Sequence, residues 1–362
     1  MANTIKANKS RIMIYGAGMI GQIIVPYIVQ QYGLLSFIEC YVDIDKMKQH
    51  HKIKISTYTY EVKPPTVLHS IENNTVLWIT NSKCYSVIEF LDSIPELENI
   101  EGYIIPIMKL QEEQISKEMT IEKVTDKPVI PKKIHYCWFG HEKMPSFLCK
   151  CIKSWEMYCP DYELICWNED NYDVDKIPYI KAAYEHQKYS FVTDIARLDI
   201  LYQYGGIYMD TDVTLLKSLD DLLYQQAFVG VEKWGNINTG GGFGAIPHHP
   251  AVETLLEYRK NDLFIREDGS LNMDTNGLYE TIPFVRKGMK IENSIQNIAN
   301  VTIYPSCVFH PYDYVSGITQ IEMSTISIHH FYGGWMDEQN VRDKKDTQNK
   351  YKEIISRMKD RD

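Results

Sequence analysis

The sequence predicts an α/β protein made of two domains, and three observations support this prediction. Short apolar segments of strand length alternate with segments of helical periodicity along most of the chain. A polar segment with two prolines, from Gln111 to Lys133, interrupts the alternation and indicates a connection between domains. The length of 362 residues is enough for two separate cores. We therefore expect one domain at residues 1–125 and a second at residues 126–362.

The first domain is expected to be a small parallel βαβ arrangement. Strands are predicted at Arg11–Tyr15, Phe37–Val42, Val76–Thr80 and Gly102–Ile105, and helices at Ile23–Gln31 and Cys84–Ser93. The first turn carries Gly16-x-Gly18-x-x-Gly21, with Asp43 after the second strand, as in dinucleotide-binding folds where the acid holds a ribose. Because the expected sheet has half of the strands of that fold, we favour a non-catalytic module, or one that binds a nucleotide or sugar loosely, over an NAD-binding oxidoreductase.

The second domain continues with a further α/β pattern. Strands are predicted at Ile134–Phe139, Tyr162–Trp167, Ile207–Met209, Phe228–Glu232, Val301–Tyr304 and Ile326–His330. Helices are predicted at Ser146–Tyr158, Tyr179–Gln187, Phe191–Tyr204, Leu219–Leu223, Pro250–Arg259 and Lys350–Met358.

Composition limits the class of protein. The formal net charge of −10 and the pI near 5.6 argue against a general nucleic-acid-binding protein, which would carry a basic field. We expect no secretory signal and no membrane-spanning segment, because the N-terminus is polar and no apolar run reaches the necessary length. The eight cysteines are irregularly spaced, which favours buried free thiols in a reducing cytoplasm over a zinc site.

Two carboxylates, Asp210 and Asp212, follow a short apolar strand of the second domain. Alternation along a strand would place both on one side, where they suit a divalent cation that keeps open positions for a diphosphate. The alternative is that Asp210–Thr214 forms the Asp-x-Asp-x-Thr nucleophile motif of a haloacid-dehalogenase-type phosphatase. The acidic pair Asp220-Asp221 comes too early for such an enzyme.

Polar residues near these carboxylates are further candidates for the site. Asp194 and Arg197 lie one turn apart in an otherwise apolar helix, where charges are costly unless paired. They either form an internal ion pair that stiffens the core or line a sugar pocket beside the metal. Asn238 precedes a glycine run, which is either a sugar-contacting segment or a flexible turn.

An ordered series of motifs in the second domain resembles the DXD-containing sugar transferases, which include bacterial capsular-polysaccharide enzymes and fungal α-1,6-mannosyltransferases. The motifs are Ile130–Gly140, Cys151–Trp155, Cys159–Tyr162, Trp167–Asp170 and Ser190–Asp212, and the resemblance extends to Trp335. It implies a GT-A fold, a nucleotide-sugar donor with UDP-sugars favoured over GDP-sugars, a divalent metal (Mn²⁺ or Mg²⁺) and retention of anomeric configuration.

The resemblance also implies donor-site roles for individual residues. Asp210 and Asp212 form the DXD pair and bind the metal with His330, Asp194 and Arg197 hold the donor sugar, Trp138 stacks on the nucleobase, and Trp335 contacts the diphosphate. For Trp138 the alternative is a core aromatic, and for His330 a buried histidine. Gly333-Gly334 stands where relatives often have serine, which is a departure from the family pattern.

We therefore predict a metal-dependent, retaining glycosyltransferase for capsule or other surface-polysaccharide synthesis. In this hypothesis Asp212, Asp194 and Arg197 carry catalysis, and the acceptor is an oligosaccharide or a lipid-linked glycan. The expected location is the cytoplasm. The basic stretch Arg342–Arg361 would allow a peripheral contact with an anionic membrane, although packing on the protein's own surface is favoured.

Overall fold

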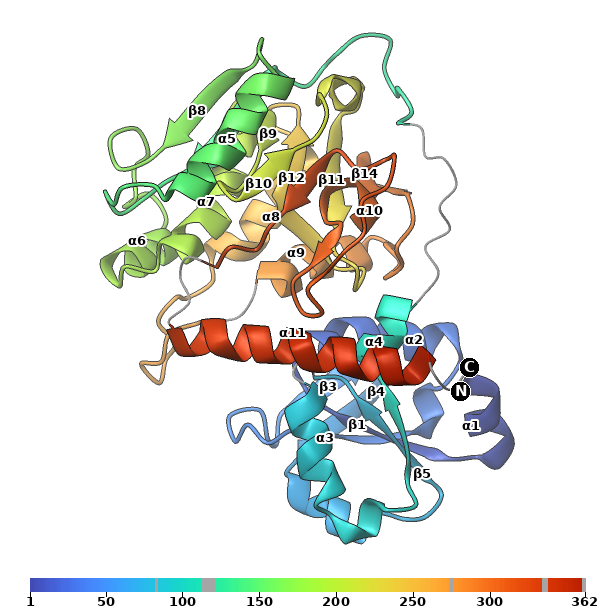
Figure 1. Ribbon diagram of the computed structural model, residues 1–362. Helices are drawn as coiled ribbons and strands as arrows, with labels where there is room; N and C mark the ends of the chain where they lie inside the picture. Colours follow the sequence, from blue (N-terminus) through green and yellow to red (C-terminus); the bar gives the residue numbers. More distant parts are fainter. Residues whose placement is uncertain (82–83, 112–120, 274–275, 334–337, 360–362) are drawn as a thin grey trace. The chain divides into compact units, whose positions relative to one another are not determined.

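The structure is a computed structural model of the whole chain, and it describes residues 1–81, 84–111, 121–273, 276–333 and 338–359 (Figure 1). The chain divides into two compact units: the first comprises Met1–Glu113 and Arg342–Asp362, and the second comprises Gln114–Val341. This division differs from the expected domains, because the C-terminal residues group with the first unit rather than with the second. Among the described helices, none combines the length and the apolar character that a membrane span requires.

A sheet of six strands, counted over the described residues, forms the centre of the first unit, in the order β3-β4-β2-β1-β5-β6. The strands are β1 (Arg11–Tyr15), β2 (Ile38–Val42), β3 (Lys52–Ile55), β4 (Tyr58–Lys63), β5 (Thr75–Ile79) and β6 (Glu101–Ile104). The helical segments are α1 (Ala2–Asn8), η1 (Ile20–Ile24), α2 (Val25–Gln31), η2 (Leu35–Phe37), η3 (Pro65–Ser70), α3 (Cys84–Asp92), η4 (Pro95–Leu97), α4 (Ile105–Gln111) and most of α11 (Glu338–Lys359). Neighbouring strands are parallel except β3 and β4.

The four strands expected in this unit are present, but the expectation of a half-size sheet is wrong. The antiparallel hairpin of β3 and β4 adds two strands. Its apolar positions are separated by lysine, threonine and glutamate residues whose side chains are mostly exposed, so the alternation gives a weak hydrophobic signal.

The glycine turn between β1 and η1 is held by contacts within the chain. The buried carboxylate of Asp43 accepts the N–H of Ala17 at 2.8 Å and the N–H of Asp45 at 2.9 Å. A Cβ on Gly21 would lie 2.1 Å from the carbonyl oxygen of Gly16, so this close approach requires glycine. These residues therefore have a structural role in the turn, and ribose binding by Asp43 stays a prediction.

The second unit contains a seven-stranded sheet among its described residues, in the order β13-β14-β11-β12-β9-β7-β8. The strands are β7 (Lys133–Cys137), β8 (Glu163–Trp167), β9 (Gly206–Tyr208), β11 (Ala227–Val231), β12 (Ile237–Ala245), β13 (Gln296–Ile298) and β14 (Val301–Tyr304). Two separate pairs are β10 (Val213–Leu215) with β17 (Ser327–His329), and β15 (Tyr312–Asp313) with β16 (Ile318–Thr319). The helices are α5 (Ser146–Tyr158), α6 (Pro178–Glu185), α7 (Tyr189–Tyr204), η5 (Asp220–Tyr224), α8 (Pro250–Lys260), α9 (Asn276–Arg286) and α10 (Ser306–Phe309).

Apolar clusters cover both faces of this sheet, which gives the unit three layers. One cluster joins Leu198 of α7 to Tyr208 of β9, and the other joins Trp155 of α5 to Ile207 of β9. Neighbouring residues of β9 thus enter opposite clusters, as the alternation of a strand requires. The predicted α/β class is confirmed.

Helix α7 and strand β9 are joined by Gly205 and Gly206, which both have positive φ. The N–H of Gly205 donates to the carbonyl oxygen of Leu201 at 2.9 Å at the end of the helix. The predicted end of the helix at Tyr204 is therefore confirmed. This connection brings the guanidinium of Arg197 on α7 over the ring of Tyr208, 5.0 Å from the ring centroid.

The glycine run at residues 240–242 does not form the flexible turn that the sequence left open. It lies in β12, which pairs antiparallel with β11 and β9. A Cβ on Gly240 would lie 2.1 Å from Oδ2 of Asp210, and a Cβ on Gly241 would lie 2.1 Å from Cε1 of His310. Glycine makes room here for neighbouring side chains, so the turn interpretation is wrong.

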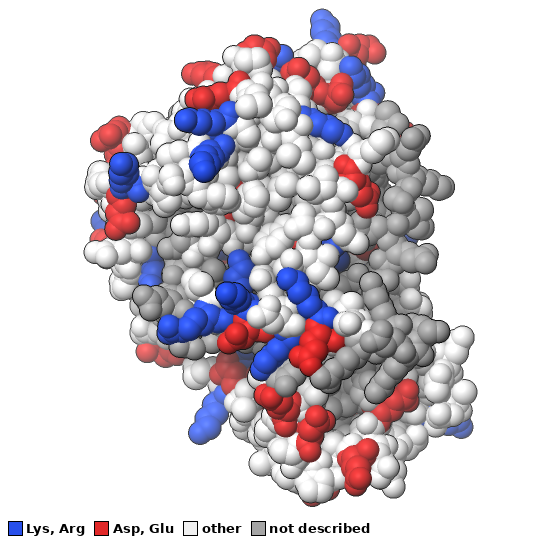
Figure 2. Space-filling model, viewed as in Figure 1, with Lys and Arg blue, Asp and Glu red and all other residues white. Residues whose placement is uncertain are grey.

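The surface of the protein carries both signs of charge. On the described residues visible in Figure 2, lysine and arginine side chains are interspersed with aspartate and glutamate. Surface charge therefore does not mark a binding site by itself, and the site is located from the buried polar residues.

Candidate functional site

Asp210 and Asp212 lie in a turn that links β9 to β10. The N–H of Val213 donates to the carbonyl oxygen of Asp210 at 3.1 Å and closes this turn. The two carboxylates are therefore brought together by the turn, and the expected strand alternation does not place them. With His329 they offer three ligand atoms within 4.8 Å of one another, and we name Asp210, Asp212 and His329 the carboxylate–histidine cluster.

His329 reaches the two carboxylates because β17 pairs with β10. In this antiparallel pair His329 lies opposite Val213. Its Nε2 lies 3.3 Å from Oδ1 of Asp212 and 3.8 Å from Oδ2 of Asp210. The ring of Phe331 stacks on the imidazole with 4.0 Å between centroids, which holds the ring in this orientation.

The structure places the ring of His329 beside both carboxylates, whereas the ring of His330, the residue predicted as a metal ligand, lies against other side chains. Neighbouring residues of a strand project to opposite sides. Nε2 of His330 lies 2.9 Å from Oγ1 of Thr214, and its ring packs edge-on against Phe147. The backbone N–H of His330 donates to the carbonyl oxygen of Asp212 at 3.1 Å, so this residue supports the turn through its main chain.

The donor set of the cluster fits a divalent cation. Carboxylate oxygens suit both Mg²⁺ and Mn²⁺, and the imidazole adds a ligand that a transition-metal ion accepts more readily than Mg²⁺ does. Burial would raise the pKa of Asp212, but His329 and hydrogen bonds that include the N–H of Tyr332 lower it to about 2. Burial would lower the pKa of His329, but Asp212 and Asp210 raise it above its usual value. The two carboxylates thus favour a positive charge at this position, which a metal ion would supply.

His329→Gln is expected to weaken Mn²⁺ binding by about tenfold or more, because it removes one ligand of the cluster. His330→Gln should have a smaller effect, because its ring contacts Thr214 and Phe147 instead. Calorimetric titration of both variants with Mn²⁺ compares them directly. Equal losses, or a larger loss for His330→Gln, would contradict the assignment of His329.

Asp210 is fixed by three neighbours. The hydroxyl of Tyr208 donates to its Oδ1 at 3.0 Å, and Nη2 of Arg197 lies 3.2 Å from the same oxygen. The backbone N–H of Asp210 donates to the carbonyl oxygen of Gly240 at 2.8 Å. Because Oδ1 is engaged, Oδ2 faces His329 and is the oxygen available to a cation.

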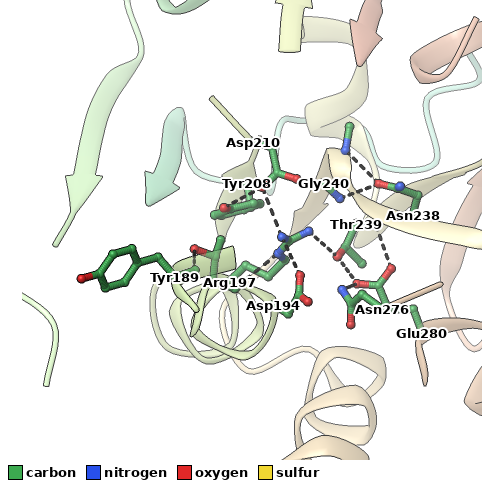
Figure 3. Close-up of polar contacts among 12 residues, drawn as sticks. Tyr189, Asp194, Arg197, Tyr208, Asp210, Asn238, Thr239, Gly240, Asn276 and Glu280 are labelled. Carbon is green, nitrogen blue, oxygen red and sulfur yellow. Dashed lines mark hydrogen bonds and ion pairs between the residues drawn. The ribbon is translucent and has the colours of Figure 1, made fainter. Parts of the chain in front are cut away.

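Arg197 links Asp194 to Asp210 (Figure 3). Its Nη2 donates to Oδ1 of Asp194 at 3.0 Å, and its Nη1 donates to Oγ1 of Thr239 at 3.3 Å. The side chain of Arg197 is 7% exposed and that of Asp194 is 15% exposed. The internal ion pair considered from the sequence is therefore present, and it extends to the cluster. Binding of a donor sugar by these two residues stays a prediction.

The other residues predicted to bind the donor are less closely connected to the cluster. The indole N–H of Trp138 donates to a backbone carbonyl oxygen at 2.7 Å in the segment after β7. The amide of Asn238 donates to Oε1 of Glu232 at 2.8 Å and accepts the N–H of Gly240 at 2.8 Å. Trp335 lies outside the described residues. Nucleobase stacking by Trp138 and sugar binding by Asn238 remain predictions.

Three residues near the cluster were missed in the sequence: Tyr208, Thr239 and Glu280. Tyr208 precedes Asp210 by only two positions, and this closeness in the sequence is a signal that points to it. Glu280 accepts the N–H of Thr239 at 3.0 Å from α9. That helix was not predicted, and Pro283 inside it weakens its helical signal.

A comparison with protein families identifies the central part of the second unit. Residues 145–229 match the model of the family described as "Glycosyltransferase sugar-binding region containing DXD motif". This segment contains Asp194, Arg197, Asp210 and Asp212. The family resemblance inferred from the motifs is therefore confirmed for this part of the chain.

Curated relatives match parts of the chain. Inositol phosphoceramide mannosyltransferase 2 of Schizosaccharomyces pombe is 29% identical over 46% of this chain and 45% of its own length. Inositol phosphoceramide mannosyltransferase 3 of the same yeast is 36% identical over 28% of this chain and 29% of its own. The matches thus span less than half of the length of either relative. Among solved structures, a galactosyltransferase LgtC in complex with donor and acceptor sugar analogs is 13% identical, covers 62% of this chain and 95% of that chain, and has a TM-score of 0.31.

Proposed function

We propose that this chain, a member of the DXD-containing glycosyltransferase family over residues 145–229, transfers a sugar from a nucleotide-sugar donor to a glycan or lipid acceptor. The observation that carries the proposal is the carboxylate–histidine cluster, with the buried cation of Arg197 beside it. A departing diphosphate accumulates negative charge, and an enzyme stabilises it with a fixed positive charge at that place.

The chain's own residues would bind and orient the reactants. Asp210, Asp212 and His329 would hold a divalent ion, Mn²⁺ in our proposal, which neutralises charge on the diphosphate when bound. Arg197 is held by Asp194 and provides a second, permanent cation near the leaving group. Because these groups are already paired and buried, little reorganisation is needed when the donor binds. Retention of the anomeric configuration is part of the proposal and follows from the family resemblance alone.

The proposed donor is a UDP-sugar. GDP-mannose is the alternative, because two relatives are named mannosyltransferases. The names of those relatives also contain a lipid, inositol phosphoceramide. The acceptor that we propose for this chain is instead an oligosaccharide or a lipid-linked glycan of a capsule or other surface polysaccharide. We propose that the reaction takes place at the cytoplasmic side of the cell membrane.

Thermal unfolding with a panel of nucleotide sugars tests this proposal. The full chain is melted with UDP-glucose, UDP-galactose, UDP-N-acetylglucosamine, GDP-mannose or NAD, each with Mn²⁺ or with a chelator. A ligand present at about 100 times its Kd stabilises by about 2.7 kcal/mol, roughly 5–10 °C in Tm for a domain of this size. We expect one nucleotide sugar to give such a shift, and to release nucleoside diphosphate, in the presence of Mn²⁺ only.

Two other outcomes would overturn the proposal. A shift with NAD and with no nucleotide sugar would favour an oxidoreductase that uses the glycine turn of the first unit. Magnesium-dependent release of phosphate from simple phosphate esters, lost in Asp210→Asn, would favour a phosphatase.

A further inference from the structure

Glu280 of α9 is a buried carboxylate at the end of a series of contacts (Figure 3). The series runs from Asp210 through Arg197 and Thr239 to Glu280. Glu280 is 2% exposed. Its Oε2 accepts the N–H of Thr239 at 3.0 Å, and its Oε1 contacts the hydroxyl of Thr239 and the side-chain amide of Asn276. Three donors thus converge on a carboxylate that has no part in the proposed function.

These hydrogen bonds fix the direction in which Thr239 donates. Its hydroxyl has one hydrogen to give and lone pairs that accept. Nη1 of Arg197 lies 3.3 Å from this oxygen, and a guanidinium can only donate. The hydroxyl therefore accepts from Arg197 and, when Glu280 is ionised, gives its own hydrogen to Oε1 of that carboxylate. Glu280 is the group that makes this direction favourable.

The planar guanidinium of Arg197 connects Thr239 to Asp210. Its Nη1 is held by Thr239, and its Nε is held by the carbonyl oxygen of Thr193 at 3.3 Å, so its plane is fixed. Nη2 then lies 3.0 Å from Oδ1 of Asp194 and 3.2 Å from Oδ1 of Asp210. Without the contact to Thr239 the guanidinium would be held only by Thr193 and the two aspartates, and Asp210 would face a less firmly oriented partner.

Burial makes a carboxylate at this position costly. It raises the pKa of Glu280 to about 7, against the lowering effect of Arg197 and of the hydrogen bonds from Thr239. An apolar side chain would fill the space without this cost. The presence of a buried acid at this position is therefore explained better by a function than by packing.

We propose that Glu280 is a positioning residue for the metal and the diphosphate: through Thr239 and Arg197 it holds Asp210 in the orientation in which Oδ2 faces His329. This inference rests on the proposed function of the carboxylate–histidine cluster. It gives Glu280 no contact with either substrate, so changes at this position act on the metal and the leaving group and not on acceptor binding.

Glu280→Gln tests the proposal with a side chain of the same size. The new NH₂ group has two possible positions. It either faces the backbone N–H of Thr239, where two donors would meet, or faces the Thr239 hydroxyl, which must then accept instead of donate. In either position the Thr239 hydroxyl no longer holds Arg197 as it does in the wild type. We expect kcat and Mn²⁺ affinity to fall by about 10- to 100-fold, with KM for the acceptor unchanged. Thr239→Val should give the same losses, and the double variant should be no worse than either single variant.

Two further variants separate positioning from packing. Thr239→Ser keeps the hydroxyl and should retain most of the activity that Thr239→Val loses. Glu257→Gln is the matched control, because it makes the same exchange at an exposed residue of α8 that is paired with Lys260. It should leave kcat and Mn²⁺ affinity unchanged.

The proposal is overturned if folded Glu280→Gln binds Mn²⁺ and turns over as the wild type does, or if the losses of the two single variants add in the double variant. If Glu280→Gln does not fold, Thr239→Val and Thr239→Ser decide the matter, since they change fewer atoms. Calorimetric Mn²⁺ affinity requires no substrate. A wild type that binds Mn²⁺ but uses no nucleotide sugar would therefore refute the proposed function, while the effect of Glu280 on the metal would still be measured.

Discussion

Asp212→Asn is expected to lower the rate of sugar transfer by about 100-fold or more and to leave the fold intact. Asparagine keeps the shape of the side chain, and its carbonyl oxygen can still accept the N–H of Tyr332, which donates to Asp212 at 2.7 Å. The change removes the negative charge that faces Nε2 of His329 at 3.3 Å. Because the imidazole can release its proton, no unpaired charge remains buried. A 100-fold loss corresponds to about 2.7 kcal/mol of transition-state stabilisation.

The measurements for this variant are nucleoside diphosphate release, calorimetric Mn²⁺ binding and thermal unfolding followed by circular dichroism. Asp221→Asn is the matched control, because this exposed carboxylate pairs with Lys123 at 3.4 Å and lies outside the cluster. Its activity should equal that of the wild type. Wild-type turnover in Asp212→Asn, or turnover that a chelator does not reduce, would exclude the cluster as a metal site.

The site residues that could be predicted are those with a strong local signal. The apolar helix α7, the glycine pair Gly205-Gly206 and the two aspartates follow one another within a single run of the sequence. Charges inside an apolar helix require partners, and the structure pairs Arg197 with both Asp194 and Asp210. The local signals were therefore sufficient to identify these residues, although a turn and not strand alternation brings Asp210 and Asp212 together.

The parts that could not be predicted depend on contacts between distant segments. His329 ends β17 and the identical residue His330 follows it directly, so only the pairing of β17 with β10 decides which ring meets Asp212. The glycines of β12 have a low strand propensity, and their fit becomes apparent only when Asp210 and His310 are placed against them. Similarly, the sequence predicts a helix at Lys350–Met358 but not the unit with which it groups, where Tyr351 is buried.

Gly240→Ala is expected to disrupt the cluster without changing any charged residue. The new Cβ would lie 2.1 Å from Oδ2 of Asp210 and 3.0 Å from Nη1 of Arg197, which is too close for the carboxylate to stay in place. Since Oδ1 of Asp210 is held by Tyr208 and Arg197, the displaced atom is the one that faces His329. We expect Mn²⁺ affinity and the transfer rate to fall by about 100-fold or more. Denaturant unfolding should show a loss of about 1–3 kcal/mol in the free energy of unfolding, as for other overpacked interiors.

Gly244→Ala separates the steric cost from the effect on the site. Gly244 lies on the same strand, and a Cβ there would lie 2.2 Å from Cε1 of Phe228 in the apolar core. This variant should lose similar stability but keep the Mn²⁺ affinity of its folded molecules. The Asp210→Ala variant lacks the carboxylate that the new Cβ would clash with. Adding Gly240→Ala to that variant should therefore lower the free energy of unfolding by less than adding it to the wild type. Two results together would contradict the cluster assignment: an equal loss of stability from Gly240→Ala in both backgrounds, and wild-type Mn²⁺ affinity in Gly240→Ala. They would mean that Asp210 does not lie against Gly240.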